Sequence, residues 1–216
     1  MKLVLASNNA KKLAELQALF DGLGVALVRQ GELGVSEAEE PHVTFIENAL
    51  VKARHASAAT GLPAIADDSG LCVDALGGMP GVASAVYAPA AARAGEGQDR
   101  EARRRTQDEA NNALLLARMQ DVEDRRASFT CTLVALRAPD DPSPLVAVGR
   151  WNGRILRARE GAGGFGYDPL MFIPAFGATV ASLAGDVKNA HSHRAIAAAR
   201  MRTLMQQAWH LGSGAA

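Results

Sequence analysis

Two adjacent carboxylates, Asp67 and Asp68, follow an apolar run that begins at Pro63. At the end of a buried strand they would repel each other and lose solvation, unless a cation or hydrogen-bond donors relieve the charge. Mg²⁺ suits such a place, because it takes one or two protein carboxylates and completes its coordination with water and phosphate oxygens. The acidic loop around Glu39 and Glu40 could supply another ligand. The alternative is a turn whose carboxylates face water and cap backbone N–H groups.

A polar turn near the start of the chain could bind phosphate. The run Ser7–Lys12 lies where an expected strand gives way to an expected helix, and the free N–H groups of a helix start attract anions. Lys11 and Lys12 in a first helical turn oppose the helix dipole unless an anion is bound there. The alternative is ordinary helix capping, for which Ser and Asn are common.

Two later runs could recognise a nucleobase or another group rich in hydrogen-bond acceptors. Gly161–Pro169 places four glycines around two aromatic residues and an acid, so the backbone can approach a ligand and a ring can stack on a base. Lys188–Arg194 gathers cations and donors that suit oxygen acceptors. A metal site there is disfavoured, because His191 and His193 are two apart and would not share a helix face. The alternatives are a flexible loop with aromatic pegs and a solvated helix start.

Helices and strands alternate in the first third of the chain, and these elements must position the candidate residues. Thr44 followed by Glu47 resembles a capping box that opens an Ala-rich helix ending near Thr60. Apolar runs predict strands over Lys2–Ala6, Val25–Val28 and Pro63–Ala66. Apolar residues at helical spacing from Leu13 to Leu23 predict a helix that Gly22 and Gly24 end.

The later strands are expected to pair as hairpins, which predicts a mixed α/β sheet flanked by helices. Phe129–Leu136 and Leu145–Trp151 form the expected long hairpin, and Asn152-Gly153 is expected to turn the chain back into Ile155. Asp99–Met119 has a helical pattern. The final helix is expected to place these residues on one face: Ala197, Met201, Leu204, Ala208 and Leu211.

Composition excludes some classes of function. The 216 residues contain 23 Lys and Arg and 23 Asp and Glu, so the chain lacks the positive field of a non-specific nucleic-acid binder. Cys72 and Cys131 lie in apolar runs and are expected to be reduced and buried. The N-terminal run is too short for a signal peptide or a membrane span, so we expect a cytoplasmic protein without membrane or nucleic-acid partners.

Taken together, the motifs resemble one family, the non-canonical purine nucleoside triphosphate pyrophosphatases, also called inosine/xanthosine triphosphate pyrophosphatases. The order and spacing match over almost the whole chain. The matching segments are Ser7-x-Asn9-x-x-Lys12, Thr44–Ala49 with Lys52–Arg54, Ala66–Leu71, Gly163–Pro169, and Ser192–Arg194 preceded by Lys188.

This resemblance implies a fold, an activity and a set of site residues. The fold would be a single two-lobed α/β domain over residues 1–216, with the active site in the cleft between the lobes and a frayed tail at 212–216. The protein would be a homodimer that hydrolyses ITP, dITP and XTP with one Mg²⁺ per subunit. Asp68 would accept a proton and bind the metal together with Glu40. The substrate-binding residues would be Ser7, Asn8, Asn9, Ala10, Lys11, Lys12, Lys52, Ser69, Phe165 as the stacking ring, Gly166, Tyr167, Asp168, Lys188, His193 and Arg194.

The sequence departs from the family pattern at Leu183–Val187, which is less acidic than usual, and at Ala88–Arg105. A 6-oxo purine would be preferred to adenine, because buried donors facing an amino group would be left unpaired; the pattern gives no means of excluding GTP. Two other functions stay open. One is a related pyrophosphatase that acts on pyrimidine or methylated nucleotides, and the other is a nucleotide sensor without turnover.

Overall fold

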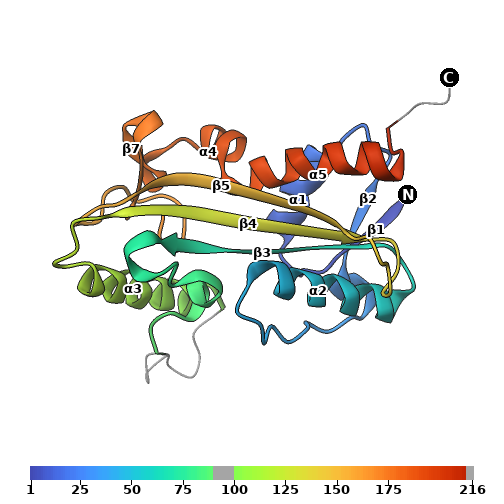
Figure 1. The fold of residues 1–216 in the computed structure, drawn as a ribbon, viewed down its shortest axis with the longest axis horizontal. Coiled ribbons are helices and arrows are strands. Elements are labelled where there is room, and N and C mark those ends of the chain that lie inside the picture. The colour runs from blue at the N-terminus through green and yellow to red at the C-terminus, as the bar shows by residue number, and fades with distance from the viewer. Residues whose placement is uncertain (90–99, 213–216) are drawn as a thin grey trace. The chain divides into compact units, whose positions relative to one another are not determined.

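The computed structural model describes residues 1–89 and 100–212, apart from the side chains of Ala10, Lys11 and Arg100 (Figure 1). Most of the divergent segment 88–105 and of the expected tail 212–216 therefore lies outside the described residues. The strands are β1 (Lys2–Leu5), β2 (Ala26–Arg29), β3 (Ala64–Val73), β4 (Arg126–Leu136), β5 (Leu145–Ile155), β6 (Met171–Ile173) and β7 (Ala178–Thr179). The α-helices are α1 (Ala10–Leu19), α2 (Phe45–Thr60), α3 (Arg100–Arg118), α4 (Gly185–His191) and α5 (His193–Trp209).

The strands form one mixed sheet with the order β2-β1-β3-β4-β5-β6-β7. β1 pairs in parallel with both β2 and β3, whereas β6 pairs antiparallel with β5 and with β7. The mixed α/β class expected from the sequence is confirmed, because helices connect the parallel strands β1, β2 and β3, whereas a short turn connects the antiparallel strands β6 and β7.

The chain divides into two compact units. The first unit consists of Met1–Asp68, Cys131–Arg150 and His191–Ala216, and the second of Ser69–Thr130 and Trp151–Ala190. The chain passes from one unit to the other within β3, within β4, within β5 and after Ala190. Each unit therefore takes part of the same three strands.

The first unit has an apolar core on each face of its part of the sheet. Strand residues alternate between the two faces, so Leu3 and Leu5 of β1 lie in one core and Val4 and Ala6 in the other. Helices α1 and α5 cover the first core with residues such as Leu16 and Met201. Helix α2 covers the second core with its alanines Ala49, Ala53 and Ala56.

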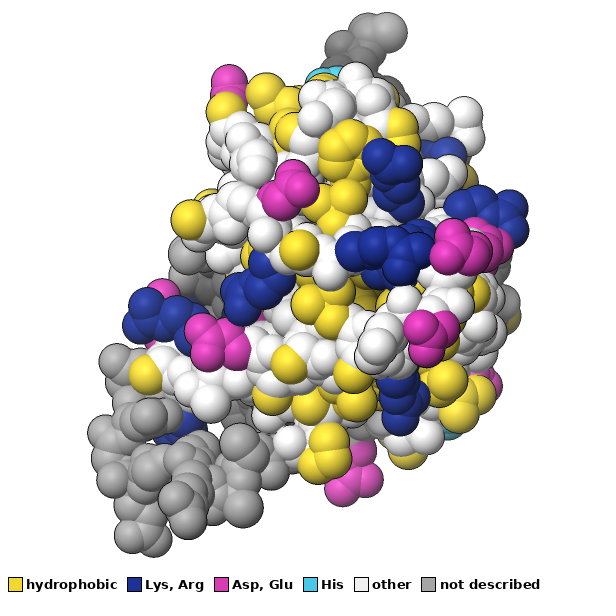
Figure 2. All heavy atoms as spheres, turned by 90° about the vertical axis from the view of Figure 1, so that its left-hand side faces the viewer, with side chains coloured by type: hydrophobic (Ala, Val, Ile, Leu, Met, Phe, Trp, Pro, Cys, Tyr) yellow, Lys and Arg dark blue, Asp and Glu magenta, His cyan; other side chains and the backbone are white. Residues whose placement is uncertain are grey.

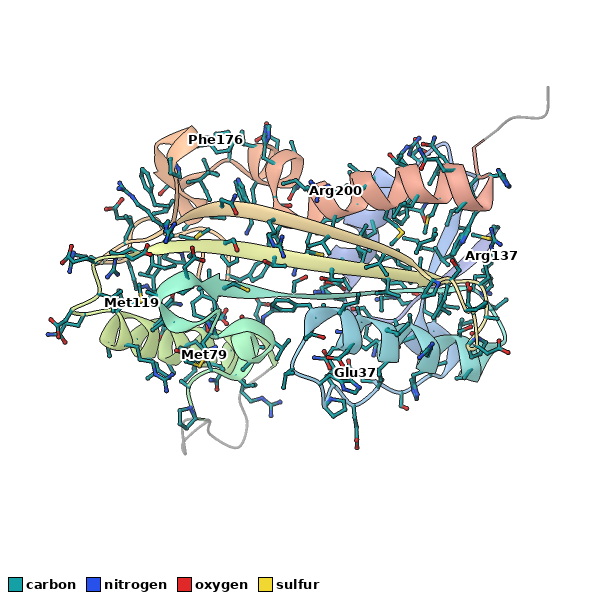
Figure 3. The ribbon with its side chains drawn as sticks, viewed as in Figure 1. Glu37, Met79, Met119, Arg137, Phe176 and Arg200 are labelled. Carbon is teal, nitrogen blue, oxygen red and sulfur yellow. The ribbon has the colours of Figure 1, made fainter. Side chains whose placement is uncertain are left out.

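The second unit has a core of its own beneath α3. Leu115 of α3 and Met119, which directly follows the helix, pack on residues of β3, β4 and β5, including Leu71 and Trp151. Met119 is labelled in Figure 3. The same core contains Tyr167, which belongs to the glycine-rich run Gly161–Pro169. This core fixes the loop that carries the candidate base-binding residues.

The expected capping box at the start of α2 is confirmed. Thr44 is the N-cap residue, its Oγ1 accepts a hydrogen bond from the backbone N of Glu47 at 3.3 Å, and it donates to the Glu47 carboxylate. The helix ends at Thr60, and Gly61 follows in the left-handed conformation, as C-terminal glycines commonly do. Local side-chain chemistry therefore fixes both ends of α2.

Three local expectations are wrong. Asn152-Gly153 makes no turn, because β5 continues through it to Ile155; a Cβ at Gly153 would overlap the carbonyl oxygen of Phe172, so the glycine permits close strand packing. Asp67 and Asp68 do not end a strand, since β3 continues to Val73 between β1 and β4. Ala208 is exposed, although the other residues expected on that face of α5 are buried or partly buried.

The described helices include none that is long and apolar enough to span a bilayer. Figure 2 shows Lys and Arg side chains interspersed with Asp and Glu side chains on the face that it presents. This mixture agrees with the net charge of zero.

Candidate active site

Asp67 and Asp68 point to opposite faces of the sheet. Neighbouring residues of a strand alternate, and the contacts follow that rule: Asp67 meets Lys12 of α1, whereas Asp68 meets Asn48 and Lys52 of α2. The two carboxylates therefore hydrogen-bond to different lysines, contrary to the simplest interpretation of their adjacency. The charge of Lys52 nevertheless acts on Asp67 as well as on Asp68.

Asp67 forms a buried ion pair on the α1 face. Nζ of Lys12 lies 2.9 Å from each oxygen of Asp67, whose side chain is 4% exposed. Burial alone would raise the pKa of Asp67, but the charges of Lys12 and Arg194 and the Lys12 hydrogen bond outweigh it, so the pKa lies well below its ordinary value. Asp67 is therefore held as a carboxylate that fixes the position of Lys12.

Asp68 lies in a different setting on the α2 face. Nζ of Lys52 contacts Oδ1 of Asp68 at 3.4 Å and Oε2 of Glu40 at 2.8 Å, and Nδ2 of Asn48 approaches Oδ2 of Asp68 at 3.4 Å. Burial raises the pKa of Asp68, Lys52 lowers it, Glu40 raises it again, and the net direction is upward. A carboxylate with a raised pKa is a better proton acceptor than an ordinary aspartate.

Lys52 binds both carboxylates of this cluster, and its own pKa responds. Burial alone would lower the pKa of Lys52, but the charge of Asp68 and the hydrogen bond to Glu40 raise it above its usual value. The Lys52 side chain is 13% exposed and that of Glu40 is 45% exposed. Glu40 and Asp68 thus converge on one cationic position that solvent reaches from the Glu40 side.

The Ser7–Lys12 turn has the geometry of a helix start. Oγ of Ser7 accepts from the backbone N of Asn9 at 3.2 Å, and Oδ1 of Asn9 accepts from the backbone N of Lys12 at 3.3 Å. Asn8 is exposed and accepts from the backbone N of Gly31 at 2.9 Å. Its amide also reaches Glu37, on the loop before α2 (Figure 3), at 3.4 Å. Ala10 and Lys11 belong to α1, but their side chains lie outside the described residues.

The glycine-rich loop of the second unit presents an exposed ring above a buried ion pair. Asp168 is 3% exposed, pairs with Nζ of Lys188 and accepts from the backbone N of Phe165 at 2.9 Å. The Phe165 ring is 44% exposed, and Nζ of Lys188 lies 4.5 Å from its centroid. Asp168 and Lys188 therefore hold the ring where an aromatic ligand could stack on it.

Tyr167 and Gly166 are held from beneath. The Tyr167 side chain is 4% exposed, and its hydroxyl donates to the carbonyl oxygen of Ser84 at 2.9 Å. Burial, together with the nearby Tyr87 and Asp108, raises the pKa of Tyr167 well above its ordinary value. The Tyr167 side chain thus anchors the loop in the core. Ser69, half-buried in β3, directly follows Asp68.

His193 and Arg194 lie in the first turn of α5 in the first unit. Ser192 is the N-cap of that helix and accepts from the backbone N of Ala195 at 3.2 Å. Helix α4 ends and α5 begins on the two sides of Ser192. The run Lys188–Arg194 is therefore the junction of two helices and not the start of one. Arg194 acts on Asp67 through its charge.

Four residues of these clusters were not expected from the sequence. Asn48 belongs to a motif that the sequence shows, but its contact with Asp68 spans 20 residues. Arg104, Asp108 and Asn112 of α3 contact Phe165 or Gly166. The signal that could have revealed the α3 residues is their spacing of four, which places them on one helix face.

The described residues contain no group of three or more His, Cys, Asp or Glu side chains that could hold a metal ion. Two carboxylates nevertheless suffice for Mg²⁺, which takes one or two from the protein. Glu40 and Asp68 form such a pair around Nζ of Lys52.

The fold and site are those of a mixed α/β protein with acidic and basic side chains gathered on a central strand and the helices beside it. A profile of the Ham1 family matches residues 3–204, and this chain belongs to that family. It is 64% identical over 211 residues to a protein named dITP/XTP pyrophosphatase from Leptothrix cholodnii, covering 98% of this chain and 100% of that protein. A protein of the same name from Methylibium petroleiphilum is 64% identical over 97% of this chain and 99% of its own length.

Solved structures agree with this assignment. A HAM1 protein from Coxiella burnetii superposes with a TM-score of 0.85 at 40% sequence identity, covering 96% of this chain and 100% of that one. The Ham1 protein of Staphylococcus aureus gives a TM-score of 0.81 at 34% identity, covering 96% of this chain and 99% of that one. The family resemblance expected from the motifs is confirmed.

Proposed function

We propose that this protein hydrolyses the triphosphates of damaged 6-oxo purines, namely ITP, dITP and XTP, to the monophosphate and pyrophosphate. The observation that carries the proposal is the pair of neighbouring carboxylates of β3: Lys12 binds both oxygens of Asp67, while Asp68 lies with Glu40 around Lys52 and has a raised pKa. Relatives at 64% identity over nearly the full chain bear the name dITP/XTP pyrophosphatase, which supports the same reaction here.

Asp68 is assigned the role of general base. It accepts a proton from, or orients, a water molecule that attacks the α-phosphorus, and the bond from that phosphorus to the bridging oxygen of the leaving pyrophosphate breaks. Its raised pKa favours proton acceptance, and Lys52 and Asn48 hold its two oxygens. Catalysis then needs no covalent nucleophile, because phosphoryl chemistry depends mainly on positioning and electrostatics.

Glu40 and Asp68 are assigned to a divalent metal ion, Mg²⁺, at one ion per subunit. Both carboxylates already face the same cationic group, Nζ of Lys52, and Glu40 raises the pKa of Asp68, so another positive charge would relieve their repulsion. When bound, the ion supplies positive charge to phosphate oxygens. The residue types present therefore fit the metal.

The triphosphate is assigned to the α1 start and the base to the glycine-rich loop. Lys12 and Lys52 neutralise phosphate charge, and the backbone N–H groups of the α1 start add donors. Phe165 offers its exposed ring for stacking. The full proposed set is Ser7, Asn8, Asn9, Ala10, Lys11, Lys12, Lys52 and Ser69 for the phosphates and their neighbourhood, and Phe165, Gly166, Tyr167, Asp168, Lys188, His193 and Arg194 for the base. We also infer a homodimer, which light scattering on the purified protein tests.

A substrate panel tests the proposal. Pyrophosphate release should be fastest with dITP, ITP and XTP, and at least about 10⁴-fold slower with dATP, because the 6-amino group of adenine would face buried donors. Chelation of divalent ions should stop the reaction. A preference for dTTP or UTP would favour the pyrimidine-directed alternative and overturn the substrate assignment.

Asp68→Asn separates enzyme from sensor. The variant should lose turnover by about 10²–10⁴-fold, the usual contribution of a general base, while nucleotide binding changes little. Rates come from pyrophosphate release and binding from calorimetry with ITP. Unchanged turnover would remove Asp68 from the mechanism, and a wild-type protein that binds ITP without hydrolysing it would be the sensor.

A further inference from the structure

We propose that helix α3 positions the base-stacking ring, through a stripe of three residues spaced four apart: Arg104, Asp108 and Asn112. Residues at this spacing lie on one face of a helix. All three contact the Phe165–Gly166 segment of the glycine-rich loop. The inference rests on the proposed function for its substrate, but the contacts themselves do not.

The peptide groups on both sides of Gly166 are held by side chains of α3. Oδ2 of Asp108 accepts a hydrogen bond from the backbone N of Gly166 at 2.8 Å, and Nδ2 of Asn112 donates to the Gly166 carbonyl oxygen at 2.8 Å. Asn112 is 1% exposed, so its amide group has little freedom to turn away. Gly166 has a φ of 59°, in the left-handed region. Two side chains one helical turn apart thus fix the backbone directly after the ring.

Arg104 contacts the ring itself. Its Cζ lies 5.1 Å from the Phe165 centroid, within the range of a cation–π contact. Arg104 is exposed and lies at the end of the segment that diverges from the family pattern. The ring is therefore restrained by Nζ of Lys188 and by the guanidinium of Arg104. It is also restrained through its backbone by the hydrogen bonds of Gly166 with Asp108 and Asn112, which we call the clamp.

The clamp matters because the Phe165 ring is exposed while its backbone neighbours are not free to move. An aromatic ring on a loose loop would lose conformational freedom when a base stacks on it, and binding would weaken accordingly. A fixed backbone removes that cost before the ligand arrives. Asp108 is therefore a positioning residue, which acts on the base through Gly166 and Phe165 rather than by touching it.

Asp108→Ala tests the clamp, with Asp108→Asn as the conservative variant and Glu109→Ala as the matched control. Glu109 is the next residue of the same helix and is exposed, so its removal deletes the same charge away from the loop. We expect Asp108→Ala to raise KM for dITP about ten-fold with kcat within about two-fold of wild type, the size of effect that one charge-assisted hydrogen bond gives. Asp108→Asn, whose amide oxygen still accepts from Gly166, and Glu109→Ala should both stay within about two-fold.

Amide hydrogen exchange of the peptide spanning residues 161–169 is the second readout. It should speed up about ten-fold in Asp108→Ala, but not in Asp108→Asn or Glu109→Ala, because only the first loses the acceptor for the Gly166 amide. An unchanged KM and unchanged exchange in Asp108→Ala would overturn the proposal. So would faster exchange spread over all of α3, which would make Asp108 a support of the helix.

The exchange arm also separates the two hypotheses. If wild-type protein failed to hydrolyse dITP, the proposed function would fall, while selective loosening of residues 161–169 would still establish the clamp. If wild-type protein hydrolysed dITP and Asp108→Ala left both readouts unchanged, only the clamp would fall.

Arg104→Ala tests the third residue of the stripe, with Arg103→Ala as the control at a neighbouring exposed arginine. Arg104→Ala should raise KM for dITP about three-fold, since the contribution of one exposed cation–π contact is modest. Equal KM values for the two variants would remove Arg104 from the stripe.

Discussion

Asp67 and Asp68 show how one peptide bond can separate two different chemical roles. Because side chains alternate along a strand, Asp67 points to Lys12 and Asp68 points to Lys52. Each carboxylate therefore contacts a lysine of a different helix. The pKa of Asp67 falls and that of Asp68 rises. In the proposed mechanism the pair therefore combines a carboxylate held in its charged form with a proton acceptor.

This difference predicts opposite effects on acid stability. The folded pKa of Asp67 lies below its unfolded value of about 3.9, so its stabilisation is complete above that value and is lost as pH falls through the folded pKa. Asp67→Asn should therefore lose less stability than wild type between about pH 5 and pH 3. Urea unfolding across this range measures the slope.

Asp68→Asn is the comparison, because the sign is reversed. A raised folded pKa means that the folded state holds the Asp68 proton more tightly, so the contribution of Asp68 to stability falls as pH rises through that pKa. Asp68→Asn should be at least as stable as wild type at pH 7, with the difference shrinking in acid. Parallel acid slopes in wild type and Asp67→Asn would contradict the buried ion pair.

At the scale of elements, the start of α5 is seated on β5 without an intervening side chain. A Cβ at Gly149 would overlap the carbonyl oxygen of His193 and lie 2.5 Å from the backbone N of Ala197. Arg200, one helical turn further along (Figure 3), donates to the carbonyl oxygen of Val148. The position of His193 and Arg194 thus depends on the absence of a side chain at Gly149 of β5.

Gly149→Ala should therefore damage both stability and activity. Backbone atoms cannot yield as a flexible side chain can, so we expect a loss of about 1–3 kcal/mol, as in overpacked cores. Displacement of His193 and Arg194 should raise KM for dITP as well. Urea unfolding and steady-state kinetics measure the two effects.

Gly185→Ala is the matched control. Gly185 begins α4, and a Cβ built there meets no atom within 4 Å. The substitution should be neutral or slightly stabilising, because alanine favours a helix more than glycine does. Equal damage from both variants would show that the contact between β5 and α5 is not the cause.

Sequence alone predicts the elements whose signals are local. The Thr44–Glu47 capping box is such a case, because donor and acceptor lie within one turn. The local sequence Asn152-Gly153 likewise predicts a turn, and this prediction is wrong. The glycine instead allows the backbone of Phe172, on another strand, to approach closely. Motif matching gave the family and its candidate residues, and it could not give the partners of those residues.

The missing partners are separated along the chain. Lys12 meets Asp67 across 55 residues, and Asp108 meets Gly166 across 58. No periodicity connects positions so far apart, because their proximity follows from strand order and helix packing. The sequence therefore indicates that Asp67 is a candidate acid, but it does not indicate that Asp67 fixes Lys12.

At the scale of the whole molecule, two units share three strands. Each unit has its own apolar core, yet neither is made of one continuous stretch of chain. Because β3, β4 and β5 each continue from one unit into the other, loss of order in one unit would leave three strands of the other running into disordered chain. We therefore expect the two units to unfold together.

The two tryptophans report on this directly. Trp151 belongs to the second unit and Trp209 to the first. The variant Trp209→Phe keeps only Trp151, and the variant Trp151→Phe keeps only Trp209. Circular dichroism measures the unfolding of the whole chain in each variant, which allows for any change in stability that the substitution causes. Within each variant, the urea midpoints from tryptophan fluorescence and from circular dichroism should coincide. A fluorescence transition that precedes the dichroism transition in one variant would show that its unit unfolds alone.

The alanines of α2 act as spacers of minimal thickness. Ala49, Ala53 and Ala56 are fully buried against β1, β3 and β4, and the same helix carries Asn48 and Lys52 to Asp68. A randomised library at these three positions, selected for dITP hydrolysis, should consequently return mostly glycine, alanine and serine. A side chain larger than alanine would move the helix away from the sheet and draw Lys52 away from Glu40 and Asp68. Such a shift disturbs the site more than the core, so inactive clones would often remain folded.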